Sequence, residues 1–237
     1  MPSPEPVAIV THWDGTAGPE IILSLANQGF RVVAPTTEEN LLMIGAPETV
    51  MSIELDPGHE ASVKEKFAGV VSLFGRIDVL VNNPMVWNDA ALAEITETMW
   101  AEVITQNTKA TFYCARAAAA VMQARGGGRI INITSTAGLS GAHTQFAVSC
   151  AGILSLTRSL AIELAPSVRV NCIATGLMDE PWIDEAGADF RQSLESKIPL
   201  SRLCRGADVA EFVGFLASSG DYFTAQTFTL DGGEFRR

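Results

Sequence analysis

Basic residues are scarce in this 237-residue chain. Its 16 lysines and arginines are outnumbered by 27 aspartates and glutamates, which gives a formal net charge of -11. A surface that binds the nucleic-acid backbone needs clustered Lys and Arg. The charge balance therefore argues against nucleic acid as a partner.

Cysteines are few and widely spaced. The four of them, Cys114, Cys150, Cys172 and Cys204, form no C-x-x-C pair. Structural zinc sites and redox dithiols use closely spaced cysteines, so we expect no metal. Isolated cysteines also suit a reducing compartment, and we expect a cytoplasmic protein.

Membrane and export signals are absent from the sequence pattern. No apolar run approaches the roughly 20 residues of a membrane span. The first six residues, MPSPEP, lack the basic segment and apolar stretch of a signal peptide. We therefore expect no membrane association. Hydrophobic residues make up 47% of the chain, enough for the sizeable core of one domain.

Short β-branched runs alternate with longer helical patterns along the whole chain. The runs are apolar on both faces, as in a parallel sheet covered by helices on each side. Such alternation predicts a doubly wound α/β fold, here with a seven-stranded Rossmann-like sheet and a single domain over residues 1–237. Strands are expected at 7–10, 31–34, 51–55, 79–81, 129–133, 169–173 and 227–230, and helices from Pro19 to about Gly29 and over 61–74, 97–124, 146–164 and 207–217.

Residues 176–201 form the only irregular stretch. Ligands of doubly wound sheets bind beyond the carboxyl ends of the strands, so we expect this segment to cover a site. Trp13, Trp87 and Trp182 are candidates for the wall of that pocket, and ordinary packing explains them equally well.

A series of short motifs runs through the chain in a fixed order. They are Asp56, FGRIDVLVNN at 74–83, Asn107, NITSTAG at 132–138, Ser149 with Ala151 and Gly152, RVNCIATG at 169–176, PLSR at 199–202 followed by DVA at 208–210, and LDGG at 230–233. Together they resemble the short-chain dehydrogenase/reductase family over almost the whole chain. The order of eight motifs makes this resemblance specific, and it implies the same fold.

The resemblance also implies a chemistry that this chain departs from. The family exchanges a hydride with NAD or NADP through a tyrosine, a lysine that lowers its pKa, a serine and an asparagine. Asn107 and Ser135 match the asparagine and serine, whereas Phe146 and Cys150 stand where the tyrosine and lysine belong. Phenylalanine has no proton to transfer. We therefore expect no catalytic residues, with His143 as the candidate substitute acid.

The nucleotide-binding positions are altered as well. The family's first turn is T-G-x-x-x-G-x-G, which lets a diphosphate approach a helix N-terminus. Here it reads THWDGTAG over 11–18, and of its glycines only Gly18 keeps its place. Thr11, Gly18, Asp56 and Asn82 are then remnants of a cofactor site. This pattern predicts no bound cofactor, or weak NAD(P) binding at most.

Three functions remain open on these residues. The leading one is a catalytically silent subunit that supports a competent dehydrogenase of the same family in a homo- or hetero-oligomer, with a hydroxyacyl or CoA-linked substrate as one possibility. Helices 97–124 and 146–164 would form the interface, with Ala118 among its contacts. The alternatives are a cofactor-independent enzyme resembling halohydrin dehalogenases and an NAD(P)-dependent oxidoreductase with substitute catalytic residues.

Overall fold

The computed structural model describes residues 5–14, 17–88 and 90–235. Their seven strands form one fully parallel sheet in the order β3-β2-β1-β4-β5-β6-β7. The strands are β1 (Val7–Val10), β2 (Arg31–Ala34), β3 (Val50–Ser52), β4 (Val79–Asn82), β5 (Gly128–Ser135), β6 (Val168–Thr175) and β7 (Thr227–Leu230). The predicted doubly wound, seven-stranded α/β fold is confirmed.

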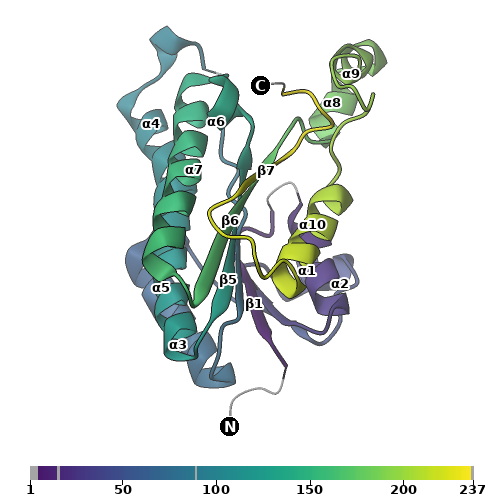
Figure 1. The fold of residues 1–237 in the computed structure, drawn as a ribbon. Coiled ribbons are helices and arrows are strands. Elements are labelled where there is room, and N and C mark those ends of the chain that lie inside the picture. Colours follow the sequence, from purple (N-terminus) through teal and green to yellow (C-terminus); the bar gives the residue numbers. More distant parts are fainter. Residues whose placement is uncertain (1–4, 15–16, 89, 236–237) are drawn as a thin grey trace.

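Helices cover both faces of this sheet (Figure 1). On one face lie α1 (Gly18–Asn27), α2 (Glu38–Met43) and α10 (Gly206–Ser218), and on the other lie α3 (Glu60–Phe74), α5 (Ala110–Ala124) and α7 (Thr144–Leu164). The alternation of β1 explains this arrangement, because Ala8 and Val10 pack into one cluster while Val7 and Ile9 pack into the other.

The strand order reverses between β1 and β4, and ligands of doubly wound sheets bind beyond the strand ends at such a point. Several shorter helices surround that end of the sheet. They are α4 (Glu97–Val103), α6 (Ala137–Ser140), α8 (Pro181–Glu185) and α9 (Ala188–Glu195), together with the single turn η1 (Leu92–Glu94).

The structure differs from the sequence prediction in several helical elements. The expected helix over 97–124 is interrupted by a π-helical segment, η2 (Ile104–Lys109), between α4 and α5. The expected irregular stretch 176–201 contains α8 and α9. Finally, α2 was not predicted; its first turn is capped by the Thr37 hydroxyl, which accepts a hydrogen bond from the Asn40 amide at 3.2 Å.

Among the described residues, α7 alone has the length and apolar composition of a membrane-spanning helix. Half of its most apolar window is buried inside the protein. It packs against α6, η2 and β6, as the core helix of a doubly wound fold does.

Candidate functional site

A cavity of about 800 Å³ opens at the carboxyl ends of the strands. Four neighbouring strands of the sheet contribute residues to its wall. These are His12 after β1, Met85 after β4, Ser135 at the end of β5 and Thr175 at the end of β6. The segment 176–201 adds Trp182 and Phe190. The segment 176–201 therefore forms part of the cavity wall, at the end of the sheet where the sequence predicted it to lie.

Three of the candidate catalytic positions line this cavity. Ser135 ends β5, and its hydroxyl accepts a hydrogen bond from the Ala137 amide at 3.1 Å. The ring of Phe146 is almost fully buried against Ala137 and Met85 and forms part of the wall. His143 is exposed at the rim with a left-handed backbone (φ 59°), directly before α7. Position 146 therefore presents a phenyl ring, without a hydroxyl group, to the cavity.

Cys150 lies behind the wall, one turn along α7 from Phe146. It packs against Phe146 and Ala147 and does not line the cavity. Burial raises the pKa of the Cys150 thiol. It is therefore a neutral thiol near neutral pH and supplies no cationic field of the kind that a lysine would.

Asn107 is buried in η2 and its amide is used by protein groups. Nδ2 donates to the Val86 carbonyl at 2.8 Å and to the Ser149 hydroxyl at 3.0 Å, while Oδ1 accepts from the Val86 amide at 3.0 Å. These bonds join the loop after β4 to α7 across the π-helical segment. Such segments are often found at functional sites, and here the segment points Asn107 inward.

The loop between β1 and α1 forms the other end of the cavity. Thr11 is buried and shares a 2.9 Å hydrogen bond with His12 Nδ1. Gly18 begins α1, and a Cβ there would lie 1.8 Å from the Trp13 carbonyl oxygen, so no other residue fits. Desolvation lowers the pKa of His12 to about 4, against the opposing charges of Asp14 and Asp56. His12 is therefore neutral near neutral pH.

The remaining two cofactor candidates make structural hydrogen bonds. Asp56 is exposed, and its Oδ1 accepts from the Gly58 amide at 3.0 Å in a turn before α3. Asn82 is buried, and its Nδ2 donates to Asn132 Oδ1 at 2.9 Å. Asn132 in turn donates to Thr157 on α7 at 2.9 Å, so Asn82 anchors a buried chain of polar groups that links β4 and β5 to α7.

Of the three candidate tryptophans, two are at the cavity and one is not. Trp87 and Trp182 line it with ring centroids 6.3 Å apart, while Trp13 packs against the core cluster beneath α1. Sequence reasoning did not single out Phe190 and Glu234, which also line the cavity. A helical pattern within 176–201 would have indicated Phe190, because α9 presents it.

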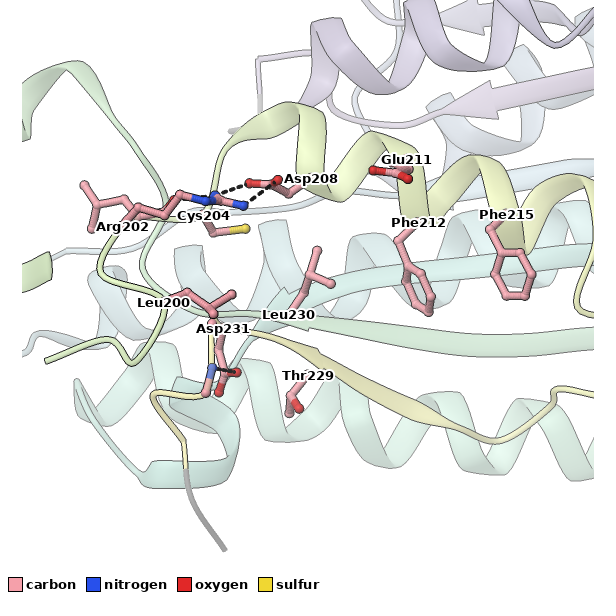
Figure 2. A pocket seen from close by; sticks show the side chains of 13 residues that line it. Leu200, Arg202, Cys204, Asp208, Glu211, Phe212, Phe215, Thr229, Leu230 and Asp231 are labelled. Atoms are coloured by element: carbon pink, nitrogen blue, oxygen red, sulfur yellow. Dashed lines mark hydrogen bonds and ion pairs between the residues drawn. The ribbon is translucent and has the colours of Figure 1, made fainter.

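A second hollow of about 880 Å³ lies between α10 and β7, away from every candidate site residue (Figure 2). Phe212, Phe215 and Leu230 form its apolar side, and Arg202 pairs with Asp208 at its rim with distances of 2.6 and 2.9 Å. It is open along the unpaired edge of the sheet, because β7 is paired only with β6.

A doubly wound sheet with a cavity at its reversal point is the architecture in which nucleotides and other ligands bind beyond the strand ends. A family model described as enoyl-(acyl carrier protein) reductase matches residues 17–234. The chain belongs to the short-chain dehydrogenase/reductase family.

Relatives cover nearly the full length of the chain. It is 33% identical to the 3-oxoacyl-[acyl-carrier-protein] reductase FabG of Thermotoga maritima, over 96% of each chain. It is 34% identical to the (2S)-[(R)-hydroxy(phenyl)methyl]succinyl-CoA dehydrogenase subunit BbsD of Thauera aromatica, over 96% of this chain and 95% of the relative.

Among solved structures, ElxO with NADP bound has a TM-score of 0.91 and 26% sequence identity, covering 97% of this chain and 98% of ElxO. A tyrosine-to-phenylalanine variant of ElxO with NADPH bound has the same TM-score, 27% identity and the same coverage of both chains.

These structures overturn one expectation. The altered loop at Thr11–Gly18 led us to expect no cofactor, and this expectation is wrong, because backbones this similar hold NADP and NADPH. The physical reason is that a dinucleotide is held largely by backbone groups and a helix N-terminus. The strand-loop-helix geometry supplies these, and Gly18 still begins α1.

Proposed function

We propose that this chain is a nicotinamide-dinucleotide-binding member of the family that lacks the family's proton-transfer pair and acts as a non-catalytic subunit beside a competent dehydrogenase. The observation that carries the proposal is the Phe146 ring in the cavity wall, with the neutral Cys150 thiol buried behind it. Neither side chain can take the role of the tyrosine and lysine.

The residues at the β1–α1 end of the cavity fit a dinucleotide. The first turn of α1 can offer backbone amides to a phosphate, except at Pro19, and Gly18 allows the preceding loop to pack directly on the helix. Thr11 lies on the same loop, and the resemblance assigns Asp56 to the adenine end. When bound, NAD(P) supplies or accepts the hydride, and these residues hold it. In ElxO, NADPH is held by a variant in which phenylalanine replaces a tyrosine.

The proton-transfer part of the chemistry is what this chain lacks. Ser135 remains at the cavity, where its hydroxyl can donate a hydrogen bond to a substrate oxygen. Asn107 is committed to Val86 and Ser149. Without an acid at position 146, Ser135 can hold a bound carbonyl group, but no tyrosine is present there to give that group a proton.

Exposed apolar side chains on the two long helices support a role in assembly. Phe112 on α5 and Val148 and Ile162 on α7 are 36%, 45% and 77% exposed. Ala118 is not part of this surface, because it is fully buried in the core, so its expected place among the interface contacts is wrong. A relative that is itself named as a dehydrogenase subunit supports the same role.

Nucleotide titration tests the first half of the proposal. We expect NADPH or NADH to bind the purified chain with a dissociation constant of about 100 μM or tighter, close to 5.5 kcal/mol of binding free energy. Calorimetry measures this directly. A chain that binds neither nucleotide at millimolar concentrations would contradict the proposal.

Reconstitution tests the second half. The chain is co-expressed with a relative that has Tyr and Lys at the positions of Phe146 and Cys150, and their joint mass and dehydrogenase activity are measured. We expect a stable complex whose activity depends on the relative's tyrosine and is lost when this chain is omitted. Full activity of the relative alone would contradict a supporting role.

His143 supports one other candidate function, an oxidoreductase with a substitute acid. It is exposed at the cavity rim, with its ring centroid 6.1 Å from that of Trp87. Turnover of a ketone by the isolated chain with NADPH, abolished in His143→Asn, would replace the non-catalytic proposal with this one.

A further inference from the structure

One end of the cavity is lined by aromatic side chains that remain partly exposed. Trp87, Trp182 and Phe190 are 44%, 39% and 38% exposed. Their rings form a row, with centroids 6.3 Å apart for Trp87 and Trp182 and 6.0 Å apart for Trp182 and Phe190. Large apolar side chains gathered at the wall of a cavity are typical of a ligand site.

The row is assembled from elements that are distant in sequence. Trp87 follows β4, Trp182 is on α8 and Phe190 is on α9. Neither α8 nor α9 is longer than eight residues, so these helices gain little stability by themselves. The positions of Trp182 and Phe190 therefore depend on contacts that fix α8 and α9 to each other and to the sheet.

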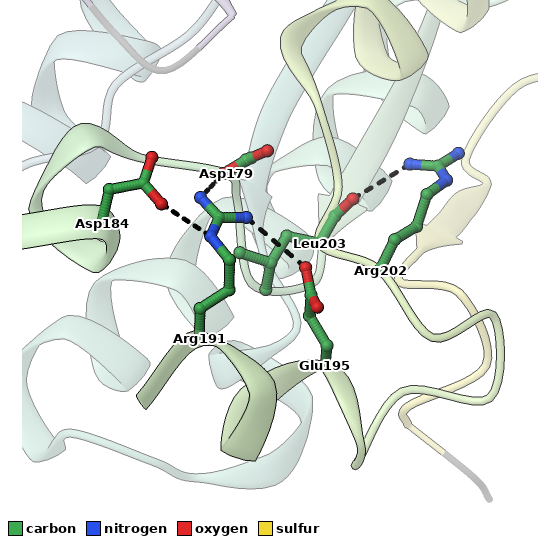
Figure 3. Close-up of polar contacts among 6 residues, drawn as sticks. All are labelled: Asp179, Asp184, Arg191, Glu195, Arg202 and Leu203. Atoms are coloured by element: carbon green, nitrogen blue, oxygen red, sulfur yellow. Dashed lines mark hydrogen bonds and ion pairs between the residues drawn. The ribbon is translucent and has the colours of Figure 1, made fainter. Parts of the chain in front are cut away.

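Arg191 makes the polar part of those contacts (Figure 3), beside an apolar cluster that includes Ile183 on α8 and Leu194 on α9. It follows Phe190 on α9, and its guanidinium reaches Asp184 on α8 at 2.7 Å, Asp179 after β6 at 2.6 Å and Glu195 on α9 at 3.4 Å. The hydrogen bonds that Arg191 donates to the Asp179 and Asp184 carboxylates raise its pKa, so it stays charged. One side chain thus ties both helices to the chain leaving β6.

The charges at this end of the cavity are negative. Glu180 and Glu234 line it, and no lysine or arginine is among its lining residues in the described part of the chain. Among the described lining residues, a carboxylate or phosphate entering here would meet Glu180 and Glu234 and no lysine or arginine. Burying an unpaired charge is costly, so this end selects against anions.

We propose that this end of the cavity binds a planar aromatic group that carries no negative charge, and that Arg191 is a positioning residue that holds Trp182 and Phe190 for it. The proposal rests on the proposed function in assigning the cavity to a substrate. It adds the class of substrate: an aromatic ketone or alcohol rather than an aliphatic or carboxylate-bearing one at this end.

Three probes of matched size test the ligand class. They are 2-acetylnaphthalene, its fully saturated decalin analogue and 2-naphthoate. Binding is followed by the indole N–H signals of the four tryptophans in nuclear magnetic resonance spectra. Trp87 and Trp182 report on the cavity, and Trp100 on α4 serves as an internal control because it does not line the cavity.

We expect 2-acetylnaphthalene to shift the Trp87 and Trp182 signals and to bind about fivefold more tightly than its saturated analogue, the range expected for ring stacking. We expect 2-naphthoate to bind at least about tenfold more weakly. Equal affinity for the saturated ketone would overturn the aromatic assignment. Equal affinity for naphthoate would overturn the exclusion of anions.

Arg191→Met tests the positioning role, with Arg125→Met as the matched control. In the described part of the chain, the Arg125 guanidinium donates one side-chain hydrogen bond, to the Gly75 carbonyl at 3.1 Å. We expect Arg191→Met to reduce the preference for the aromatic ketone over its saturated analogue to less than about twofold. Arg191→Lys should restore part of it. An unchanged preference in a folded Arg191→Met protein would overturn the positioning role.

The same samples separate this proposal from the proposed function. NADPH is titrated in the absence of the ketone, and the ketone in the absence of NADPH. Aromatic binding without nucleotide binding would contradict the proposed function alone. Nucleotide binding with no response of Trp87 or Trp182 to 2-acetylnaphthalene would contradict the aromatic site alone.

Discussion

At the scale of single residues, the altered positions are Phe146, Cys150 and His12. Each is packed as an ordinary part of the protein: Phe146 and Cys150 lie in one apolar cluster, and His12 is bonded to Thr11. These three side chains are therefore held in place by contacts with their neighbours. We therefore expect substitutions at these positions to change the chemistry of the site without changing the fold.

Restoring the catalytic pair is the first such change. We expect Phe146→Tyr with Cys150→Lys to raise ketone reduction by NADPH about 100-fold over the unmodified chain, because a positioned acid contributes roughly that factor. Initial rates followed by NADPH absorbance measure it. Phe146→Tyr alone is the control and should gain far less, since without the lysine its pKa stays high. Equal rates for all three proteins would contradict this account of the missing activity.

His12 gives a pH prediction. Its pKa is lowered from 6.5 to about 4 by desolvation, so the unfolded chain takes up a proton before the folded one does as the pH falls. Stability is therefore full above about pH 6.5 and declines between pH 6.5 and 4. From pH 7 to 5 we expect His12 to account for a loss of about 2 kcal/mol, measured by urea unfolding. His12→Asn should lose that much less over the same interval, and an identical pH dependence in both proteins would contradict the prediction.

At the scale of elements, the π-helical segment η2 is the feature that best explains the site. It carries Asn107, whose amide supports the Val86 backbone and the Ser149 hydroxyl. The segment couples the loop after β4, which carries Trp87 at the cavity, to α7, which carries Phe146. A substitution in η2 that removes these hydrogen bonds should therefore shift the residues that line the cavity.

Removing the Asn107 side chain tests this coupling. We expect Asn107→Ala to lower the free energy of unfolding by about 2 kcal/mol, because it removes the partner of two part-buried backbone groups of Val86 and of the buried Ser149 hydroxyl. Asn40→Ala is the control; Asn40 bonds the Thr36 hydroxyl at 3.2 Å on the partly exposed α2, and its loss should cost less than about 1 kcal/mol. Denaturant unfolding of both variants measures the difference, and equal losses would contradict the prediction.

The elements also show how far the sequence could predict the structure. Apolar β-branched runs such as Val7–Val10 specify their strand locally, because burial on both faces requires them to be apolar throughout. The π-helical segment leaves no such trace, since its backbone register shifts without a change of hydrophobic period. The cavity wall was partly predictable: Trp87 and Trp182 stand out by residue type, whereas Arg191 acquires its role only when the fold brings Asp179 and Asp184 to it.

The nucleotide site could not be judged from its side chains. His12 and Asp14 in the loop 11–18 suggested lost binding, yet the backbone that approaches a diphosphate is set by β1, α1 and the packing of Gly18 on Trp13. A sequence motif shows which side chains stand beside a binding site. It does not show directly whether backbone amides can still contact the ligand.

At the scale of the whole molecule, the exposed apolar side chains of α5 and α7 give a prediction about assembly. We expect Ile162→Glu to dissociate the oligomer, because Ile162 is 77% exposed on α7, within the proposed interface. Leu42→Glu is the control, since Leu42 is 79% exposed on α2 over the opposite face of the sheet. Light scattering measures the masses. An unmodified chain that is monomeric alone and with its relative would contradict the proposed assembly.

The first and last described segments differ in how close they lie to the cavity. Glu234 and Phe235 line it, and the Phe235 amide donates to Asp231 Oδ2 at 2.8 Å, whereas β1 begins at the opposite end of the parallel strands (Figure 1). A purification tag fused after Phe235 would start at the mouth of the ligand site and compete with what binds there. A tag placed before Val7 would emerge far from it, so ligand screens on this protein should use amino-terminal fusions.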